Sequence, residues 1–268
     1  MSFSKIESIS CGQGAPSLFL IVLAGEGYFH ADVVVVADTG WETDMLWSTG
    51  KRTDSKIFFE NITKPLSESF GIQAVFVRSK RKDGTEYPPI PDMQHPGKED
   101  IPLFGSEGGR LRQTCTSKWK IQAIRQELRR QGAKSAITYL GLTLDEVHRI
   151  KPNNVKWEQL SWPLIGYPIR DNWTKKFRRF EINKELMKRN IPFLITSQCD
   201  GCPHKDYFRW KNNSQEKITE LAKFERRWEG KQFLTSCRKP LPEALIEMEN
   251  QVTKNNTLDF CENGYCFQ

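Results

Sequence analysis

The chain has 268 residues, of which 38% are hydrophobic and 27% charged, with a mean hydropathy of -0.59. This length allows one large domain or a domain with appendages, and the composition excludes an integral membrane protein, since no stretch approaches the roughly 18 apolar residues of a spanning helix. The net charge of +7 favours polyanionic partners such as nucleotides or nucleic acid.

The N-terminal residues show no basic start, apolar centre and small-residue cleavage site, so we expect a cytoplasmic protein. The seven cysteines are an odd number, and the expected compartment is reducing. Metal, cluster or catalytic roles are therefore favoured over a complete disulfide framework.

The first part of the chain predicts alternating strands and helices. The β-branched run at 32–38 is typical of a central parallel strand. We expect a buried helix at 17–27 that ends at glycine. The other elements expected here are a strand at 5–10, a loop at 11–16, a mostly helical segment at 55–71 and a strand at 73–79.

The stretch 80–113 is rich in glycine, proline and charge, and such long irregular loops are generally functional or disordered. After it, Ile121, Ile124 and Leu128 form an apolar stripe on a helix expected at 117–132. A strand at 134–142, helices near 171–190 and 214–229, and a cysteine-containing tail complete the predicted elements.

This alternation indicates an α/β fold with a mostly parallel sheet flanked by helices. We expect a nucleotide-binding domain at 1–170 and a helical C-terminal region with the cysteine motifs at 171–268. Ligands in such sheets bind at the carboxyl ends of the strands, so the loops at 10–17, 38–44 and 141–149 are the expected floor of the site.

The segment SCGQGAPS at 10–17 joins the first strand to the first helix. Glycines let backbone N–H groups approach an anion, and a helix N-terminus adds a favourable dipole. Ser10 and Ser17 can donate hydroxyl hydrogen bonds to phosphate oxygens. The segment is neither a P-loop nor a GxGxxG fingerprint, and an ordinary strand–helix turn is an equally good interpretation.

The segment VVVVADTGWETD at 33–44 places Asp38, Thr39 and Gly40 where a buried strand ends. The acid lies where the sheet opens to a ligand, and Gly40 permits a tight turn. The alternative is a polar turn in which Asp38 or Thr39 caps a helix.

Together these segments resemble the phosphoadenosine-phosphosulfate reductase family, within the adenine-nucleotide α-hydrolase or PP-loop superfamily. The resemblance implies a Rossmann-like fold of PP-loop (HUP) type. The family's usual SGGxDS loop corresponds to residues 12–17, where Pro16 replaces the acid. Three later segments agree in order: RQTCTSKWKI at 112–121, LGLTLDEVHR at 140–149, and SWPLIGYPIRDNW at 161–173 followed by SQCDGCPH.

The resemblance implies a site for ATP and Mg²⁺ in which Lys120, Arg149 and Asp38 are catalytic. Lys120 and Arg149 would neutralise phosphate charge, Arg149 as a bidentate fork. For any one basic residue alone, a solvated surface charge is the better interpretation. The nucleotide-binding residues implied are Ser10, Gly12, Gln13, Gly14, Ser17, Asp38, Thr39, Gly40, Arg149 and Arg170.

For the cysteines, the resemblance implies a [4Fe–4S] cluster held by Cys115, Cys199 and Cys202, because thiolates suit iron–sulfur clusters. A structural Zn²⁺ site built from the CxxC pair with Cys261 and Cys266 is the alternative. A thioredoxin-like couple is disfavoured, because the pair does not follow an early strand.

We therefore expect an ATP-dependent adenylating enzyme that activates a substrate for sulfur transfer. The acceptor is a nucleic acid (tRNA or DNA) or a small molecule, and a sulfur donor is needed. One alternative is a sulfonucleotide reductase, in which a tail thiol acts with a thioredoxin-like reductant. Another is a protein that binds a nucleotide or a nucleic acid without catalysing a reaction and that is stabilised by a structural zinc site.

Overall fold

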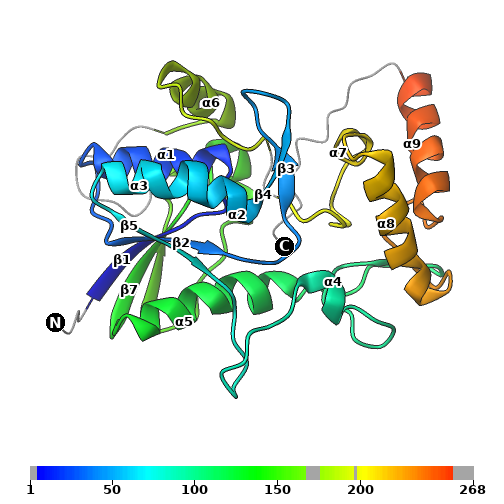
Figure 1. Ribbon diagram of the computed structural model, residues 1–268, viewed down its shortest axis with the longest axis horizontal. Helices are drawn as coiled ribbons and strands as arrows, with labels where there is room; N and C mark the ends of the chain where they lie inside the picture. Colours follow the sequence, from blue (N-terminus) through cyan, green and yellow to red (C-terminus); the bar gives the residue numbers. More distant parts are fainter. Residues whose placement is uncertain (1–4, 167–175, 196–197, 256–268) are drawn as a thin grey trace. The chain divides into compact units, whose positions relative to one another are not determined.

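The computed structural model describes residues 5–166, 176–195 and 198–255, with side chains up to residue 252 (Figure 1). Its contacts divide the chain into two compact units. Unit 1 comprises Met1–Tyr87 and Ser117–Gln198, and unit 2 comprises Pro88–Thr116 and Cys199–Gln268. Within the described residues, no helix is both long and apolar enough to cross a membrane.

Unit 1 is built on a five-stranded sheet in which every neighbouring pair is parallel. The strand order is β5-β2-β1-β7-β8. Ser8 in the central strand pairs with Val33 on one side and with Thr138 on the other. The strands are β1 (Lys5–Ser10), β2 (Val33–Ala37), β5 (Gln73–Val77), β7 (Ser135–Leu140) and β8 (Glu158–Ser161). The predicted α/β class with a parallel sheet is confirmed.

Helices cover both faces of this sheet, and alternate residues of β2 point to opposite sides. Val34 and Val36 belong to a core with α1 (Ala15–Gly25) and α6 (Arg179–Lys188). Val33 and Val35 belong to a second core with α5 (Gln122–Arg130). In Figure 1, α1 and α3 lie on one side of the sheet and α5 on the other. Burial on both faces explains the unbroken β-branched sequence of β2.

Shorter elements complete unit 1. The hairpin of β3 and β4 follows β2, and the side chain of Asp54 caps the next helix by accepting from the Ile57 amide. The shorter elements are β3 (Thr43–Met45), β4 (Arg52–Asp54), α2 (Ser55–Phe58), α3 (Lys64–Ser69), the π-helical turns η1 (Phe59–Thr63) and η2 (Thr116–Ile121), and the 3₁₀ turns η3 (Leu144–Arg149) and η4 (Pro163–Ile165).

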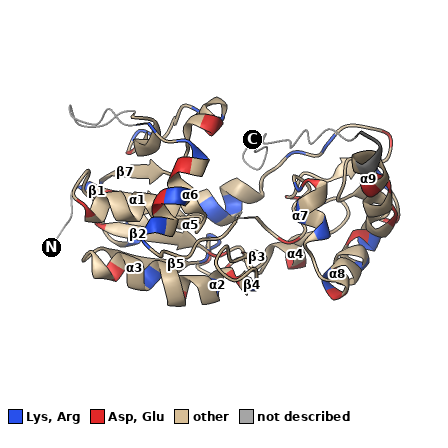
Figure 2. Ribbon diagram, turned by 90° about the horizontal axis from the view of Figure 1, so that it is seen from above, with Lys and Arg blue, Asp and Glu red and all other residues tan. Residues whose placement is uncertain are grey.

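Unit 2 combines the irregular stretch before Ser117 with the C-terminal helices. Glu225 is buried and accepts hydrogen bonds from the amides of Leu234 (2.7 Å) and Leu241 (2.6 Å), which fixes the chain between α8 and α9. Helices α8 and α9 carry charges of both signs (Figure 2). The elements are α4 (Ile90–Met93), β6 (Phe104–Gly105), α7 (Tyr207–Lys211), α8 (Gln215–Glu225), η5 (Arg226–Trp228), β9 (Gln232–Phe233) and α9 (Leu241–Asn255).

The boundaries of these two units differ from the expected division into domains at 1–170 and 171–268. Residues 88–116, expected as a loop of the nucleotide-binding domain, belong to the same compact unit as the C-terminal helices. Strand β6 in this stretch pairs with β9, so the stretch is tied to unit 2 by backbone hydrogen bonds.

Candidate functional site

The strand order of unit 1 reverses between β1 and β7, because the chain leaves β1 toward β2 and β5 on one side, and β7 and β8 lie on the other. Loops that leave adjacent strands in opposite directions open a crevice at their carboxyl ends. The loops concerned are 11–14 after β1 and 141–143 after β7, both among those predicted to form the site.

The loop after β1 is organised around a buried thiol. The Cys11 sulfur accepts from the Gln13 amide (3.4 Å) and contacts the Ser17 hydroxyl oxygen (3.5 Å). Burial raises the pKa of Cys11 to about 11, and the two hydrogen bonds lower it only in part. Cys11 is therefore a neutral thiol that holds the loop together at physiological pH.

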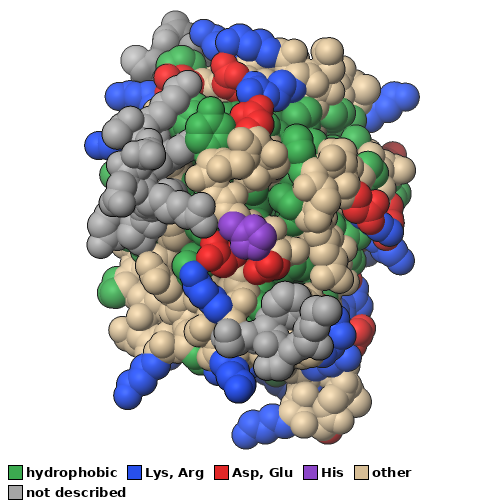
Figure 3. All heavy atoms as spheres, turned by 90° about the vertical axis from the view of Figure 1, so that its left-hand side faces the viewer, with side chains coloured by type: hydrophobic (Ala, Val, Ile, Leu, Met, Phe, Trp, Pro, Cys, Tyr) green, Lys and Arg blue, Asp and Glu red, His purple; other side chains and the backbone are tan. Residues whose placement is uncertain are grey.

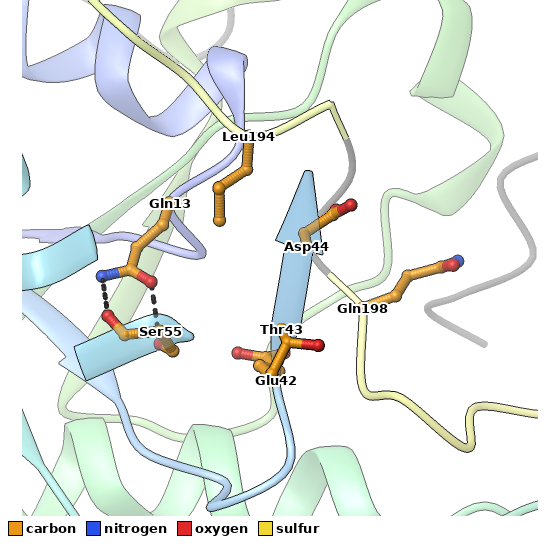
Figure 4. A pocket seen from close by; sticks show the side chains of 7 residues that line it. All are labelled: Gln13, Glu42, Thr43, Asp44, Ser55, Leu194 and Gln198. Atoms are coloured by element: carbon orange, nitrogen blue, oxygen red, sulfur yellow. Dashed lines mark hydrogen bonds between the residues drawn. The ribbon is translucent and has the colours of Figure 1, made fainter. Parts of the chain in front are cut away.

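Gln13 adopts a left-handed backbone conformation with φ of 63°, which is uncommon for a residue other than glycine. Its buried side chain is held at both ends, because the amide nitrogen donates to the Ser55 carbonyl (2.9 Å) and the amide oxygen accepts from the Ser55 hydroxyl (2.7 Å). Figure 4 shows these two bonds between the loop and α2. The loop conformation thus depends on a residue 42 positions away.

Helix α1 begins at Ala15, two residues earlier than predicted, with Gly14 as its N-cap and Pro16 in its first turn. Ser17 is buried, and its hydroxyl donates to the Gly14 carbonyl (2.9 Å). A Cβ atom on Gly141 would lie 2.9 Å from the Ser17 nitrogen, so the loop after β7 approaches the start of α1 closely. Of the predicted phosphate ligands, Gly12 is exposed and Ser10 ends β1 half-buried.

Asp38, Thr39 and Gly40 form a tight turn directly after β2. One Asp38 oxygen accepts from the Gly40 amide (2.7 Å), and the other pairs with Arg78. The Thr39 hydroxyl accepts from the Trp41 amide (3.3 Å), and Gly40 has a φ of 65°. These bonds form a polar turn, as in the alternative interpretation, but the turn leads to β3 and not to a helix that Asp38 or Thr39 would cap.

Lys120 forms an ion pair with Glu42, and both side chains are largely buried. Glu42 also lines a small pocket of about 10 Å³, far below the roughly 300 Å³ at which ligand pockets begin. Figure 4 shows Gln13 and Leu194 facing the β3 segment across this pocket. The lining residues are Gln13, Glu42, Thr43, Asp44, Ser55, Leu194 and Gln198.

The sequence analysis missed Glu42, Asp44 and Ser55 as site residues. Two acids at alternate positions of the segment GWETD were the available signal for the carboxylates. Ser55 carried none, because its role depends on the hairpin of β3 and β4, which was not predicted.

Arg149 ends η3, and its guanidinium contacts the buried carboxylate of Glu146. Arg179 also lies 3.3 Å from the same carboxylate. Arg149 is therefore held by an acid three residues earlier on its own turn. Arg170, the other predicted arginine, lies outside the described residues.

In unit 2, Cys115 and the CxxC segment are connected through Gln113. The Gln113 amide nitrogen lies 3.7 Å from the Cys115 sulfur, and its oxygen lies 3.3 Å from Nε2 of His204. Burial and the nearby Arg110 lower the pKa of His204 to about 4, so this ring is neutral. Segments 84 positions apart in sequence thus share one hydrogen-bond network.

Cys199 and Cys202 lie on one turn, in which the Cys202 amide donates to the Cys199 carbonyl (3.1 Å). All three predicted cluster cysteines are half-buried. Among the residues described, no group of three or more His, Cys, Asp or Glu side chains is placed to hold a metal ion. The tail cysteines of the zinc alternative, Cys261 and Cys266, lie outside that part of the chain.

The chain matches no family model, no curated protein and no solved structure.

Proposed function

We propose that unit 1 is a nucleotide-binding domain of PP-loop type that uses ATP to adenylate an acceptor. One observation carries this proposal. The loop 11–14 leads into α1 at the point where the strand order reverses, and Gly141 brings the loop after β7 against it. Open parallel sheets bind nucleotides at such crevices, and helix N-termini favour phosphate.

Glu42 and Asp44 supply carboxylate oxygens, the ligands that Mg²⁺ prefers, and both line the small pocket. Because that pocket is too small for a nucleotide, the metal ion would bind there and the nucleotide would lie over the adjacent loops. Mg²⁺, when bound, would neutralise charge on the phosphates. Lys120 would exchange Glu42 for a phosphate oxygen, which releases the Glu42 carboxylate for the ion.

The proposed reaction is the attack of an acceptor oxygen on the α-phosphorus of ATP. The new bond joins the acceptor oxygen to the α-phosphorus, and the bond from that phosphorus to the bridging oxygen breaks. Pyrophosphate leaves with the electron pair, and the acceptor hydroxyl loses its proton. Positive charge from Lys120 and Arg149 would stabilise the negative charge that develops on the phosphates. A sulfur nucleophile could then displace AMP from the adenylated acceptor.

The cluster predicted from Cys115, Cys199 and Cys202 stays a prediction. The hydrogen bonds of Gln113 support a common location for the two segments, but the described side chains do not form a complete ligand set. No step of the proposed adenylation passes through a cluster.

The test is ATP–pyrophosphate exchange by anaerobically purified protein in the presence of candidate acceptors. Lys120→Ala should lower exchange by about 100-fold, the usual loss when one charge-stabilising donor is removed. Lys184→Ala, a matched change on the exposed side of α6, should leave exchange unchanged. Absence of ATP binding by calorimetry would refute the proposal, and binding without exchange would refute the adenylation step.

A further inference from the structure

An open groove runs along the solvent side of α5 in unit 1. The opposite side of the same helix, with Ala123, Ile124 and Leu128, packs on the sheet. The groove is therefore a feature of the outer surface, distinct from the core and from the small pocket. The residues that line it include Ile121, Gln122, Arg125, Gln126, Arg129 and Trp157.

Arg129 lies over the ring of Trp157, with its guanidinium carbon 3.9 Å from the ring centroid, which is a stacking distance. Its Nη1 donates to the Ala133 carbonyl (2.7 Å), which fixes the plane of the group. Arg129 is nevertheless exposed, so its outer face is turned to solvent. A planar guanidinium stacked on an indole is a platform on which a nucleobase can stack.

Arg125 is fixed in the groove in a similar way. Its Nε donates to Glu158 (2.7 Å), and its Nη2 donates to Asn153 (3.2 Å). Glu158 is buried, so the carboxylate that holds Arg125 lies on the inner side of the arginine, away from solvent. Two arginines of the groove therefore have orientations set before any ligand binds, which lowers the entropic cost of binding.

Positive charge gathers around the groove. Residues 117–134 contain six basic residues and one acidic residue. Gln122 and Gln126 both donate to the Lys80 carbonyl, at 2.8 and 2.7 Å, which anchors the exposed basic run at 80–82 beside α5. By contrast, the face of unit 1 in Figure 3 carries lysines and arginines interspersed with acidic, polar and hydrophobic side chains.

We propose that this groove binds a single-stranded nucleic acid, with a base stacked on Arg129 and the backbone phosphates against the basic residues around α5. An acidic protein segment would satisfy the charge but not the flat platform, since stacking on arginine and aromatic planes is typical of unpaired bases. Duplexes keep their bases paired and would leave the platform unused.

The groove also leads toward the candidate site. Ile121 follows Lys120, whose ammonium pairs with Glu42, and Arg129 lies eight residues further along. At the helical rise this separation is about 12 Å. A strand bound along the groove would thus extend from the platform toward the carboxyl end of the sheet, where an acceptor is needed. The binding itself does not depend on the proposed reaction with ATP.

The test is fluorescence anisotropy with a labelled 15-nucleotide single strand, as RNA and as DNA, without ATP. Arg129→Ala should weaken binding about tenfold by removing the stacked platform. Arg129→Lys should bind with intermediate affinity, because it keeps the charge but loses the plane. A combined Lys80→Gln, Arg81→Gln and Lys82→Gln variant should lower the slope of log affinity against log salt by about 2.

The matched control is the combined Lys56→Gln, Lys64→Gln and Lys184→Gln variant on α2, α3 and α6, which makes the same change in net charge elsewhere. It should bind within about twofold of wild type. Circular dichroism checks that every variant is folded. Equal affinity of wild type and Arg129→Ala would overturn the proposal, as would equal loss in the control variant. Equally tight binding of polyphosphate of matched charge, or of a duplex, would also overturn it.

Discussion

The buried thiol of Cys11 makes a quantitative prediction about stability at high pH. Burial raises the pKa of Cys11 from its ordinary value of 9.0 to about 11. Between these values the unfolded chain loses the thiol proton while the folded chain keeps it. The stabilisation is therefore complete below pH 9 and is lost as the pH rises toward 11.

The size of the effect follows from the two pKa values. At pH 10 the unfolded thiol is mostly ionised and the folded thiol is not, so the free energy of unfolding should be lower by about 1.4 kcal/mol than at pH 8 on account of this group. Lysines and tyrosines also titrate in this range. Cys11→Ala removes only the thiol, and the wild-type minus variant difference isolates its contribution.

The assay is urea unfolding of wild type and Cys11→Ala at several values between pH 8 and pH 10. The loss of packing in the variant shifts every point equally, so only the slope against pH is used. Peptide-level alkylation gives a second measurement. At pH 8, Cys11 should react about 100-fold more slowly in the folded protein than in urea, because its thiolate fraction is lower by that factor. A pH-independent difference, or equal alkylation in both states, would refute the assignment of Cys11 as a buried neutral thiol.

Two further predictions concern close contacts. Gly141→Ala should lower the free energy of unfolding by about 1–3 kcal/mol, because the new Cβ would lie 2.9 Å from the Ser17 nitrogen; unchanged stability in guanidinium would contradict this close approach. Glu225→Ala should cost on the order of 2–4 kcal/mol, because the buried amides of Leu234 and Leu241 lose their acceptor. Hydrogen exchange should show faster exchange at these two amides, and retained protection would argue against the role given to Glu225.

Much of the sheet could be predicted from sequence, because its central strands are unambiguous. The run at 33–37 is apolar at every position, as expected for a strand that is covered on both faces, and it forms β2. Strand β8 was missed because its sequence, EQLS, has three polar residues and is only four residues long. This segment forms a strand because it pairs with β7, and that tertiary contact cannot be read from its composition.

Helix α9 shows a different failure. Its sequence LPEALIEMENQVTKN contains strong helix formers and an acid in the first turn, so local propensity was sufficient to predict it. The hairpin of β3 and β4 could not be predicted because its strands, like β8, are very short. A three-residue strand shows almost no alternation of apolar and polar residues.

In the candidate site, the sequence predicted where the loops meet but not what their side chains do. Arg149 was expected to face a phosphate, and its guanidinium contacts Glu146. The acid three residues earlier was visible in sequence, but burial of that acid was not. Asp38 likewise pairs with Arg78. The two residues are 40 positions apart in the sequence, so no local sequence pattern predicts their contact.

The order of pairing in the sheet has a consequence for synthesis on the ribosome. The central strand β1 emerges first, yet the residues that flank it on one side come late, since Ser8 meets Thr138 across 130 positions. Unit 2 has the same property, because residues 88–116 must wait for the chain beyond Cys199. Long-range parallel pairing slows folding and leaves apolar edges exposed meanwhile. The nascent chain is thus expected to need protection by chaperones until β7 and the residues beyond Cys199 have been made.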